Sequence, residues 1–206
     1  GGNVSAWADQ SGTGDSNKNA TQGTASQQPA YSASDAGYGG QATVSFDGSN
    51  DMMASGTWAA ALAQPETAFI VGNFSGAAVN EYFSDDKDTN NNRVIFNNSG
   101  ASRAAIYAGA TLDSGLGLSA AKSIIAGQFN AATSKIWVSA LTANASGSSG
   151  GVTTRTGITL GSSQAGSAFL NGKISEVIIY NSVLSAPDFA TVMNYLGARY
   201  AITIGP

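Results

Sequence analysis

Short strand-like runs recur along most of the chain, and glycine, asparagine, serine or proline residues separate each run from the next. Many short runs at such spacing indicate an antiparallel sandwich or barrel. The expected strands are 41–46, 67–74, 79–84, 93–97, 103–108, 122–129, 135–141, 157–160 and 173–180. The sequence therefore predicts an all-β fold, a two-sheet antiparallel β-sandwich.

Three segments carry more specific signals. The run 173–180 is apolar on both faces towards its end, which is typical of a central strand covered on both sides. The stretch 11–40 is rich in turn residues and is expected to be irregular and not helical. The stretch 144–151 has the Ser/Gly composition of a flexible loop between strands.

One C-terminal helix is predicted. Ser185 can cap its start, Pro187 suits its first turn, and Asp188 favours its positive end. Apolar side chains then recur at helical spacing, namely Phe189, Val192, Met193, Leu196 and Tyr200. Such a stripe is expected to pack on the sandwich.

Composition excludes several functional classes. The chain has no histidine and no cysteine, which removes His-based acid–base catalysis, Cys nucleophiles, disulfides and most zinc sites. Its 9 basic and 13 acidic residues give a net charge of −4, and no basic cluster is present to bind nucleic acid or an anionic membrane. A low-charge composition rich in Gly, Ser, Thr and Asn is typical of extracellular, cell-surface or virion proteins.

Four sequence motifs indicate a family resemblance through their order and spacing. They are VSAWADQSG at 4–12, QPAY at 28–31, VSFDGSND at 44–51 and LNGKISEVIIYN at 170–181. Together they resemble the laminin G-like, concanavalin A-like lectin/glucanase superfamily. The resemblance implies a concanavalin A-like jelly roll, a single domain over residues 1–206, within a larger or processed chain. Related chains usually carry a further strand before the Trp7 segment, and its absence here is expected to reflect either truncation or completion by another segment.

The superfamily includes glycosidases, so the spacing of the glutamates in this chain bears on the catalytic alternative. The retaining glucanases of this fold carry Glu and Asp at alternate positions of one strand. Glu66, Glu81 and Glu176 are the only glutamates, and none has a carboxylate at that spacing. The lyases of this fold use histidine, which is absent. We therefore expect no enzyme activity, and a divergent glycosidase remains a lower-ranked alternative.

Trp137 is the first candidate for a sugar platform, because a pyranose ring stacks on aromatic side chains. In the run 135–141 the residues Ile136 and Val138 belong to one apolar face, so Trp137 points the other way together with Lys135. That other face is either open to ligand or covered by a loop or the helix. The sequence leaves both alternatives.

Further ligand candidates are Tyr82, beside the acidic loop, and Tyr107, which follows Arg103 on another strand. Trp7 and Trp58 border turns and are expected to be packing anchors.

The loop 85–92 is a candidate calcium site. Asp85, Asp86, Asp88 and Asn90 place oxygen ligands close together, as a hard cation requires. The loop lacks the glycine and the final glutamate of an EF-hand, and a solvated hairpin loop rich in Asx residues explains the same pattern.

The leading hypothesis is a non-catalytic glycan-binding module of an extracellular, cell-surface or phage virion protein. Its expected partners are a glycan or polysaccharide and neighbouring domains or subunits of a larger assembly. The alternative is a structural display or fibre subunit that mediates protein–protein contacts.

Overall fold

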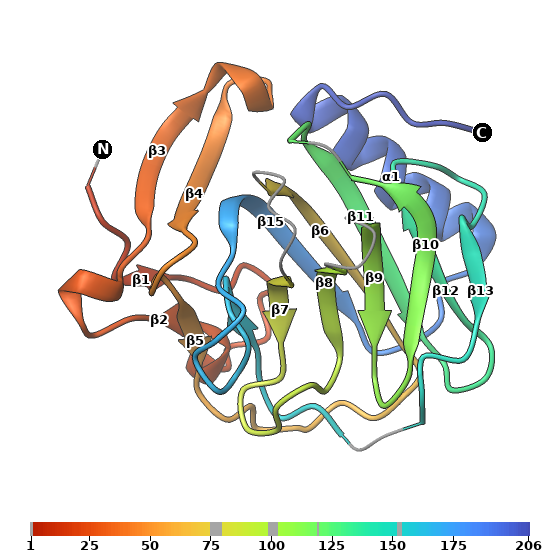
Figure 1. Ribbon diagram of the computed structural model, residues 1–206, viewed down its shortest axis with the longest axis horizontal. Coiled ribbons are helices and arrows are strands. Elements are labelled where there is room, and N and C mark those ends of the chain that lie inside the picture. The colour runs from red at the N-terminus through yellow and green to blue at the C-terminus, as the bar shows by residue number, and fades with distance from the viewer. Residues whose placement is uncertain (1, 75–79, 99–102, 119, 152–153) are drawn as a thin grey trace.

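The computed structural model describes residues 2–74, 80–98, 103–118, 120–151 and 154–206. Its strands form two antiparallel sheets of eight and seven strands that enclose a common apolar core (Figure 1). Within the described residues there is one α-helix, α1 (Ala186–Tyr200), and it is too short and polar to cross a membrane. The predicted all-β sandwich with one C-terminal helix is confirmed.

The first sheet has the order β1-β2-β5-β14-β7-β8-β9-β10. Its strands are β1 (Ala6–Trp7), β2 (Ala20–Thr21), β5 (Met53–Ser55), β14 (Thr159–Leu160), β7 (Glu81–Asp85), β8 (Val94–Asn98), β9 (Arg103–Tyr107) and β10 (Thr111–Gly117). The second sheet has the order β13-β12-β11-β6-β15-β4-β3. Its strands are β13 (Ala145–Gly147), β12 (Ser134–Val138), β11 (Ser123–Phe129), β6 (Glu66–Phe74), β15 (Asn171–Tyr180), β4 (Gln41–Asp47) and β3 (Ala30–Asp35).

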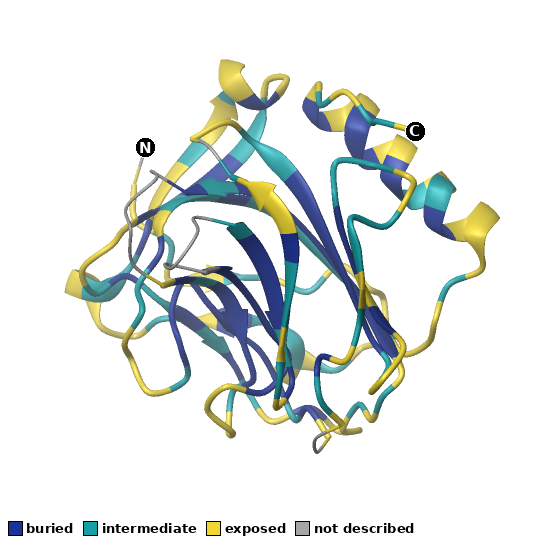
Figure 2. Cartoon of the chain, turned by 45° about the vertical axis from the view of Figure 1, so that its right-hand side comes forward, coloured by how far each residue is buried: buried dark blue, intermediate teal, exposed yellow. Residues whose placement is uncertain are grey.

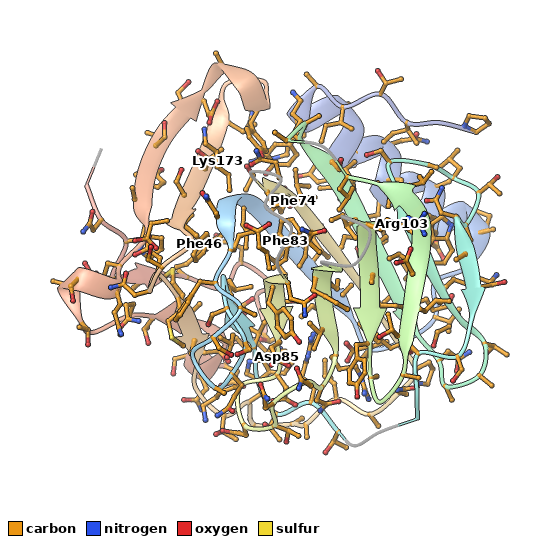
Figure 3. The ribbon with its side chains drawn as sticks, viewed as in Figure 1. Phe46, Phe74, Phe83, Asp85, Arg103 and Lys173 are labelled. Carbon is orange, nitrogen blue, oxygen red and sulfur yellow. The ribbon has the colours of Figure 1, made fainter. Side chains whose placement is uncertain are left out.

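Aromatic side chains from both sheets fill the core between them. Phe46, Phe74 and Phe83 lie in this core, and the rings of Phe74 and Phe83 meet edge to face at 6.3 Å (Figure 3). Gly161 allows the closest approach: a Cβ there would lie 2.1 Å from the Phe46 ring, and its φ of +78° also favours glycine.

The helix covers the outer face of the seven-stranded sheet. Its residues Phe189, Met193 and Leu196 are buried against Phe69 of β6 and Ile124 of β11. Figure 2 shows buried and exposed positions alternating along α1, as the predicted stripe requires. Hydrophobic burial on this face therefore holds the helix in place.

The predicted cap of α1 is confirmed. The Ser185 hydroxyl accepts a hydrogen bond from the Asp188 backbone N–H at 3.3 Å and donates to the Asp188 carboxylate at 2.6 Å. Ser185→Ala is expected to lower the free energy of unfolding by about 1 kcal/mol, because one helix N–H loses its acceptor. Urea unfolding of the two proteins measures this, and an unchanged midpoint would contradict the assigned role of the cap.

The sequence analysis did not predict several short strands. The expectation that 11–40 is irregular and not helical is wrong, because β2 and β3 lie there. So do three short 3₁₀ helices, Ser16–Lys18, Ala25–Gln27 and Ala36–Tyr38. The expected loop 144–151 contains β13, and the glycine-containing β10 was not predicted at all. These strands have few large apolar residues, so they lack the alternation on which the prediction depends. Residue 79 of the expected run 79–84 lies outside the described residues.

The β3–β4 hairpin is tied to the rest of its sheet by an ion pair. The Lys173 ammonium of β15 lies 2.7 Å from the Asp35 carboxylate, which also accepts the Gly37 backbone N–H at 2.8 Å. The hydrogen bond from Lys173 holds the pKa of Asp35 below its ordinary value. The folded state therefore binds this proton less readily than the unfolded chain does.

A pH-dependent contribution to stability follows. The stabilisation by Asp35 is present above the unfolded pKa of about 4 and is lost as pH falls through the lower folded pKa. Asp35→Asn is expected to lower the free energy of unfolding by about 1 kcal/mol at pH 7 and by much less near pH 2. Chemical unfolding at both pH values measures this difference, and an equal cost at both would contradict the ionic role of Asp35.

Candidate functional site

An aromatic strip lies on the outer face of the eight-stranded sheet. Strand register places Tyr82, Phe96 and Ala105 directly opposite one another across β7, β8 and β9, and Val94 opposite Tyr107 in the next row. These five residues form one apolar cluster, separate from the core and from the cluster beneath the helix. We call them the aromatic face. It lies on the side of the sandwich opposite α1 (Figure 1).

The aromatic face has a buried base and partly exposed rings. Val94, Phe96 and Ala105 are buried, whereas Tyr82 and Tyr107 are half-buried and present part of each ring to solvent. The rings of Tyr82 and Phe96 are tilted at 54° with centroids 5.4 Å apart. Ring contacts of this kind fix the tyrosine orientation before a ligand arrives.

Polar groups border the aromatic face. The Tyr82 hydroxyl donates a hydrogen bond to the Asn91 side-chain oxygen at 2.7 Å. Burial raises the pKa of Tyr82, so its hydroxyl stays protonated at neutral pH. On the other side, the Arg103 guanidinium lies 3.9 Å from the carboxylate of Asp113, which stands opposite Ala105. Arg103 and Asp113 are both partly exposed, so they can exchange this contact for ligand hydroxyls.

The structure therefore brings together three of the five proposed ligand residues, Tyr82, Tyr107 and Arg103, and separates the other two. Trp137 and Lys135 lie on β12 in the other sheet. The Trp137 ring is only 7 % exposed and packs on Phe189 of α1 with centroids 4.4 Å apart. The helix covers this face of the sheet, so the assignment of Trp137 as an open sugar platform is corrected to a packing role. Lys135 is exposed beyond the helix.

The loop after β7 is organised around a buried carboxylate. Asp85 accepts hydrogen bonds from four backbone N–H groups at 2.8–3.1 Å, those of Asp86, Asn91, Asn92 and Gln164. Burial raises the pKa of Asp85, and these four donors oppose that rise. The Asp85 oxygens are thus already committed within the protein.

The other candidate calcium ligands are spread around the same loop. Asp86 accepts from the Asn92 side-chain amide at 2.8 Å, Asp88 accepts from the Thr156 hydroxyl at 2.7 Å, and Asn90 is exposed. Within the described ranges, no three or more acidic, His or Cys side chains are grouped to hold a metal ion. This arrangement supports the alternative of a hydrogen-bonded Asx-rich loop, and calcium binding stays a prediction.

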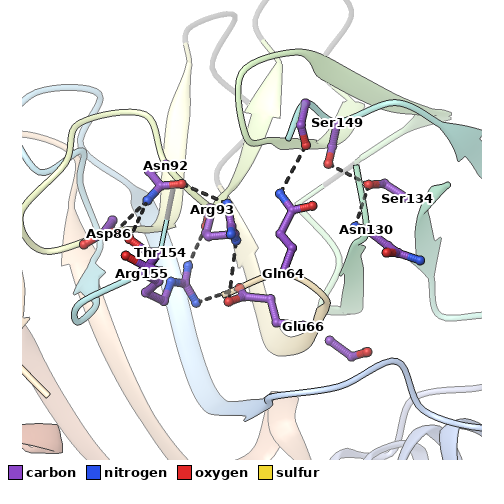
Figure 4. Close-up of polar contacts among 12 residues, drawn as sticks. Gln64, Glu66, Asp86, Asn92, Arg93, Asn130, Ser134, Ser149, Thr154 and Arg155 are labelled. Carbon is purple, nitrogen blue, oxygen red and sulfur yellow. Dashed lines mark hydrogen bonds and ion pairs between the residues drawn. The ribbon is translucent and has the colours of Figure 1, made fainter. Parts of the chain in front are cut away.

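A buried ionic cluster lies below this loop, and the sequence analysis did not identify it. Glu66 of β6 lies between Arg155, at 3.3 Å, and Arg93, at 3.6 Å, and all three side chains are almost fully buried (Figure 4). The Arg155 guanidinium also donates to the Arg93 carbonyl at 2.6 Å. Burial raises the pKa of Glu66 and lowers that of Arg93, while their mutual attraction opposes both shifts. The cluster joins three segments beneath the candidate site.

Glu81 is a further buried carboxylate, and it faces away from the aromatic face. It stands opposite Asn97 and accepts the Asn171 backbone N–H at 3.0 Å. Burial raises its pKa. The aromatic face and its border therefore contain one carboxylate, that of Asp113. Most glycoside hydrolysis depends on a close pair of carboxyl groups.

No protein-family model and no curated sequence matches this chain. Solved structures do match. A GH54 α-L-arabinofuranosidase soaked with a cyclic sulfate inhibitor has a TM-score of 0.67 and 14 % identity, over 96 % of this chain and 51 % of that one. A Trypanosoma rangeli sialidase in complex with sialic acid has a TM-score of 0.55 and 10 % identity, over 76 % of this chain and 28 % of that one.

A third match, an HCR/D W1238A mutant, has a TM-score of 0.55 and 11 % identity, over 74 % of this chain and 42 % of that one. This chain spans about half or less of the length of these three proteins. At such low identity the likeness shows the fold alone, a β-sandwich that also occurs in proteins acting on carbohydrate.

Proposed function

We propose that this protein is a non-catalytic glycan-binding module and that the aromatic face is its binding site. One observation carries the proposal: register brings Tyr82, Tyr107 and Arg103, each a candidate from sequence, onto one sheet face around a buried apolar base. Two of the similar structures are a sialidase in complex with sialic acid and an α-L-arabinofuranosidase. That likeness supports a carbohydrate ligand without assigning its identity.

The chemistry of the aromatic face suits a sugar. The exposed parts of the Tyr82 and Tyr107 rings can stack on the C–H face of a pyranose, while Arg103 and Asp113 can bond its hydroxyls. We expect a dissociation constant of roughly millimolar to micromolar per site. Multivalent display on an extracellular, cell or virion surface would raise the apparent affinity.

A glycan array tests this function. The purified protein, displayed multivalently, is expected to bind at least one glycan class, and Tyr107→Ala is expected to weaken that binding about tenfold, which corresponds to about 1.4 kcal/mol. Tyr195→Ala is the matched control, because this tyrosine is 48 % exposed on α1 at the opposite face. Thermal unfolding confirms that both variants are folded.

Each outcome has a meaning. An equal loss of glycan binding in Tyr107→Ala and Tyr195→Ala would contradict the assignment of the aromatic face as the binding site. A blank array would favour the structural display alternative, in which the sandwich contacts neighbouring subunits. Repeating the array with a chelator tests the proposed calcium dependence: loss of binding would assign a cation to the loop 85–92.

The second candidate function is a divergent glycoside hydrolase, favoured by the coverage of 96 % of this chain by the GH54 fold match. Against it stands the single carboxylate, Asp113, beside the tyrosines. Incubation of the bound glycan with the protein and measurement of new reducing ends separates the two. Turnover that Asp113→Asn abolishes would establish the hydrolase.

A further inference from the structure

The two tyrosines of the aromatic face stand on opposite sides of β8. Tyr82 lies on β7, opposite Phe96 of β8, and Tyr107 lies on β9, opposite Val94 of the same strand. Neighbouring strands are roughly 4.8 Å apart, so two strand spacings separate the backbones that carry these rings by roughly 10 Å across the sheet. Within the described chain, no ring pair joins Tyr82 to Tyr107. The aromatic face thus carries two separate stacking platforms.

One sugar ring cannot cover both platforms. Stacked rings have their centroids roughly 4.5–7 Å apart, so a single pyranose reaches one tyrosine at a time. Between the tyrosines, Val94 and Phe96 are almost fully buried and add little accessible surface. A ligand that uses both Tyr82 and Tyr107 therefore contains more than one sugar unit and bridges β8.

The spacing of the platforms matches alternate units of an extended glycan. One pyranose with its linking oxygen extends about as far as one strand spacing, so two spacings separate a unit from the next but one. In a flat chain with a twofold screw, which β-1,4 linkage favours, alternate units turn the same face towards the protein. Both tyrosines can then stack on the same C–H face of a repeating unit.

Small residues border both ends of the line through the two tyrosines. Past Tyr107, the turn 108–110 has the sequence Ala-Gly-Ala, and β10 is the last strand of its sheet. Past Tyr82, whose backbone N–H donates to the Ala168 carbonyl at 3.0 Å, the segment 165–168 has the sequence Ala-Gly-Ser-Ala. Gly109 and residues 165–167 are exposed. A chain lying over the tyrosines can therefore continue past each of them, as an internal stretch of a polymer must.

The polar border of the aromatic face suits a neutral chain. The guanidinium of Arg103 and the carboxylate of Asp113 lie 3.9 Å apart, and both are partly exposed. Their charges cancel, and the whole chain carries a net charge of −4, so this border offers no excess positive charge to a polyanion. Arg103 donates and Asp113 accepts hydrogen bonds, a combination that suits sugar hydroxyls.

We propose that the aromatic face binds an internal stretch of a neutral, unbranched, β-1,4-linked polysaccharide, with Tyr82 and Tyr107 stacked on alternate sugar units. This inference rests on the proposed glycan-binding function and adds the class of ligand to it. A trisaccharide is the shortest ligand that reaches both tyrosines. Once one unit is bound, the second contact forms at a high effective concentration, so the two weak contacts reinforce each other.

The test is calorimetric titration with β-1,4-linked oligosaccharides of glucose, xylose, mannose or N-acetylglucosamine, from the monosaccharide to the hexasaccharide. In at least one series, the dissociation constant is expected to fall about tenfold between the disaccharide and the trisaccharide. Longer members are expected to gain less with each added unit. This dependence on chain length is measured on the unaltered protein, so it does not require any variant to fold.

Variants assign the length dependence to the two tyrosines. In Tyr82→Ala and in Tyr107→Ala, the trisaccharide is expected to bind no more tightly than the disaccharide, because one platform is lost. Tyr82→Phe and Tyr107→Phe retain the ring and are expected to retain the tenfold fall. Tyr195→Ala, on the exposed side of α1, is the control and is expected to behave as the unaltered protein does. Thermal unfolding verifies that each variant is folded.

The outcomes separate this inference from the proposed function. Equal dissociation constants for the monosaccharide and the trisaccharide, or a length dependence that survives Tyr82→Ala, would overturn the inference and leave glycan binding in place. Array binding confined to terminal or charged sugars would overturn it in the same way. If neither the array glycans nor any of the four series bind, the inference and the proposed function both fail.

Discussion

Glu66→Ala is expected to lower the free energy of unfolding by about 3–5 kcal/mol, because it leaves two buried guanidinium groups without their carboxylate. Arg155 and Arg93 lie 3.3 and 3.6 Å from Glu66, and each of the three side chains is at most 1 % exposed. Water cannot replace the lost carboxylate without opening this part of the fold. The expected structural consequence is loosening of the loop 85–92, whose Asn92 bonds Arg93 at 3.0 Å.

Urea unfolding measures this effect, and Glu176→Ala provides the matched control. Glu176 also contacts an arginine, Arg199 at 3.4 Å, and accepts a hydrogen bond from the Tyr200 hydroxyl at 2.8 Å, but the Glu176 and Arg199 side chains are both partly exposed. The control is expected to cost about 1 kcal/mol or less, because water solvates the arginine that remains. Similar decreases in the free energy of unfolding for Glu66→Ala and Glu176→Ala would contradict the view that burial makes the Glu66 cluster indispensable for stability.

Trp137→Ala is also expected to lower the free energy of unfolding by about 3–5 kcal/mol, because it leaves a cavity beneath α1. The ring is 7 % exposed and stacks on Phe189, so its removal also weakens the attachment of the helix. Glycan affinity of the folded fraction is expected to stay unchanged, because the aromatic face lies on the other sheet. Thermal unfolding and binding at low temperature measure the two properties separately.

The outcome of Trp137→Ala distinguishes a packing residue from a ligand residue. Tyr195→Ala, at an exposed position on the same helix, is expected to change stability by less than about 0.5 kcal/mol. A stable Trp137→Ala variant that had lost glycan binding would contradict the structure-based assignment and restore the sugar-platform hypothesis.

Local patterns predicted the elements whose sequence signals are strong. The Ser185 cap and the apolar stripe after it define α1, and β-branched runs define β6, β11 and β15. Alternation on β12 correctly placed Trp137 on the face opposite Ile136. It did not determine what covers that face, because the docking of α1 depends on contacts between residues distant in sequence, such as Phe69 and Trp137 with Phe189.

The candidate site shows the same limit. Tyr82, Tyr107 and Arg103 were each identifiable as ligand candidates, but their convergence depends on the register that sets Val94 opposite Tyr107. Glu66, Arg93 and Arg155 were not identifiable, since isolated charged residues are usually solvated and nothing local indicates that three distant ones are buried together.

The most direct test of the central claim is an NMR titration of the isotope-labelled protein with an oligosaccharide that the array identifies. The account predicts that amide shifts concentrate on β7, β8 and β9, around Tyr82, Phe96 and Tyr107, and saturate with a single dissociation constant. Shifts confined to α1 around Tyr195 would contradict the aromatic face as the glycan-binding site.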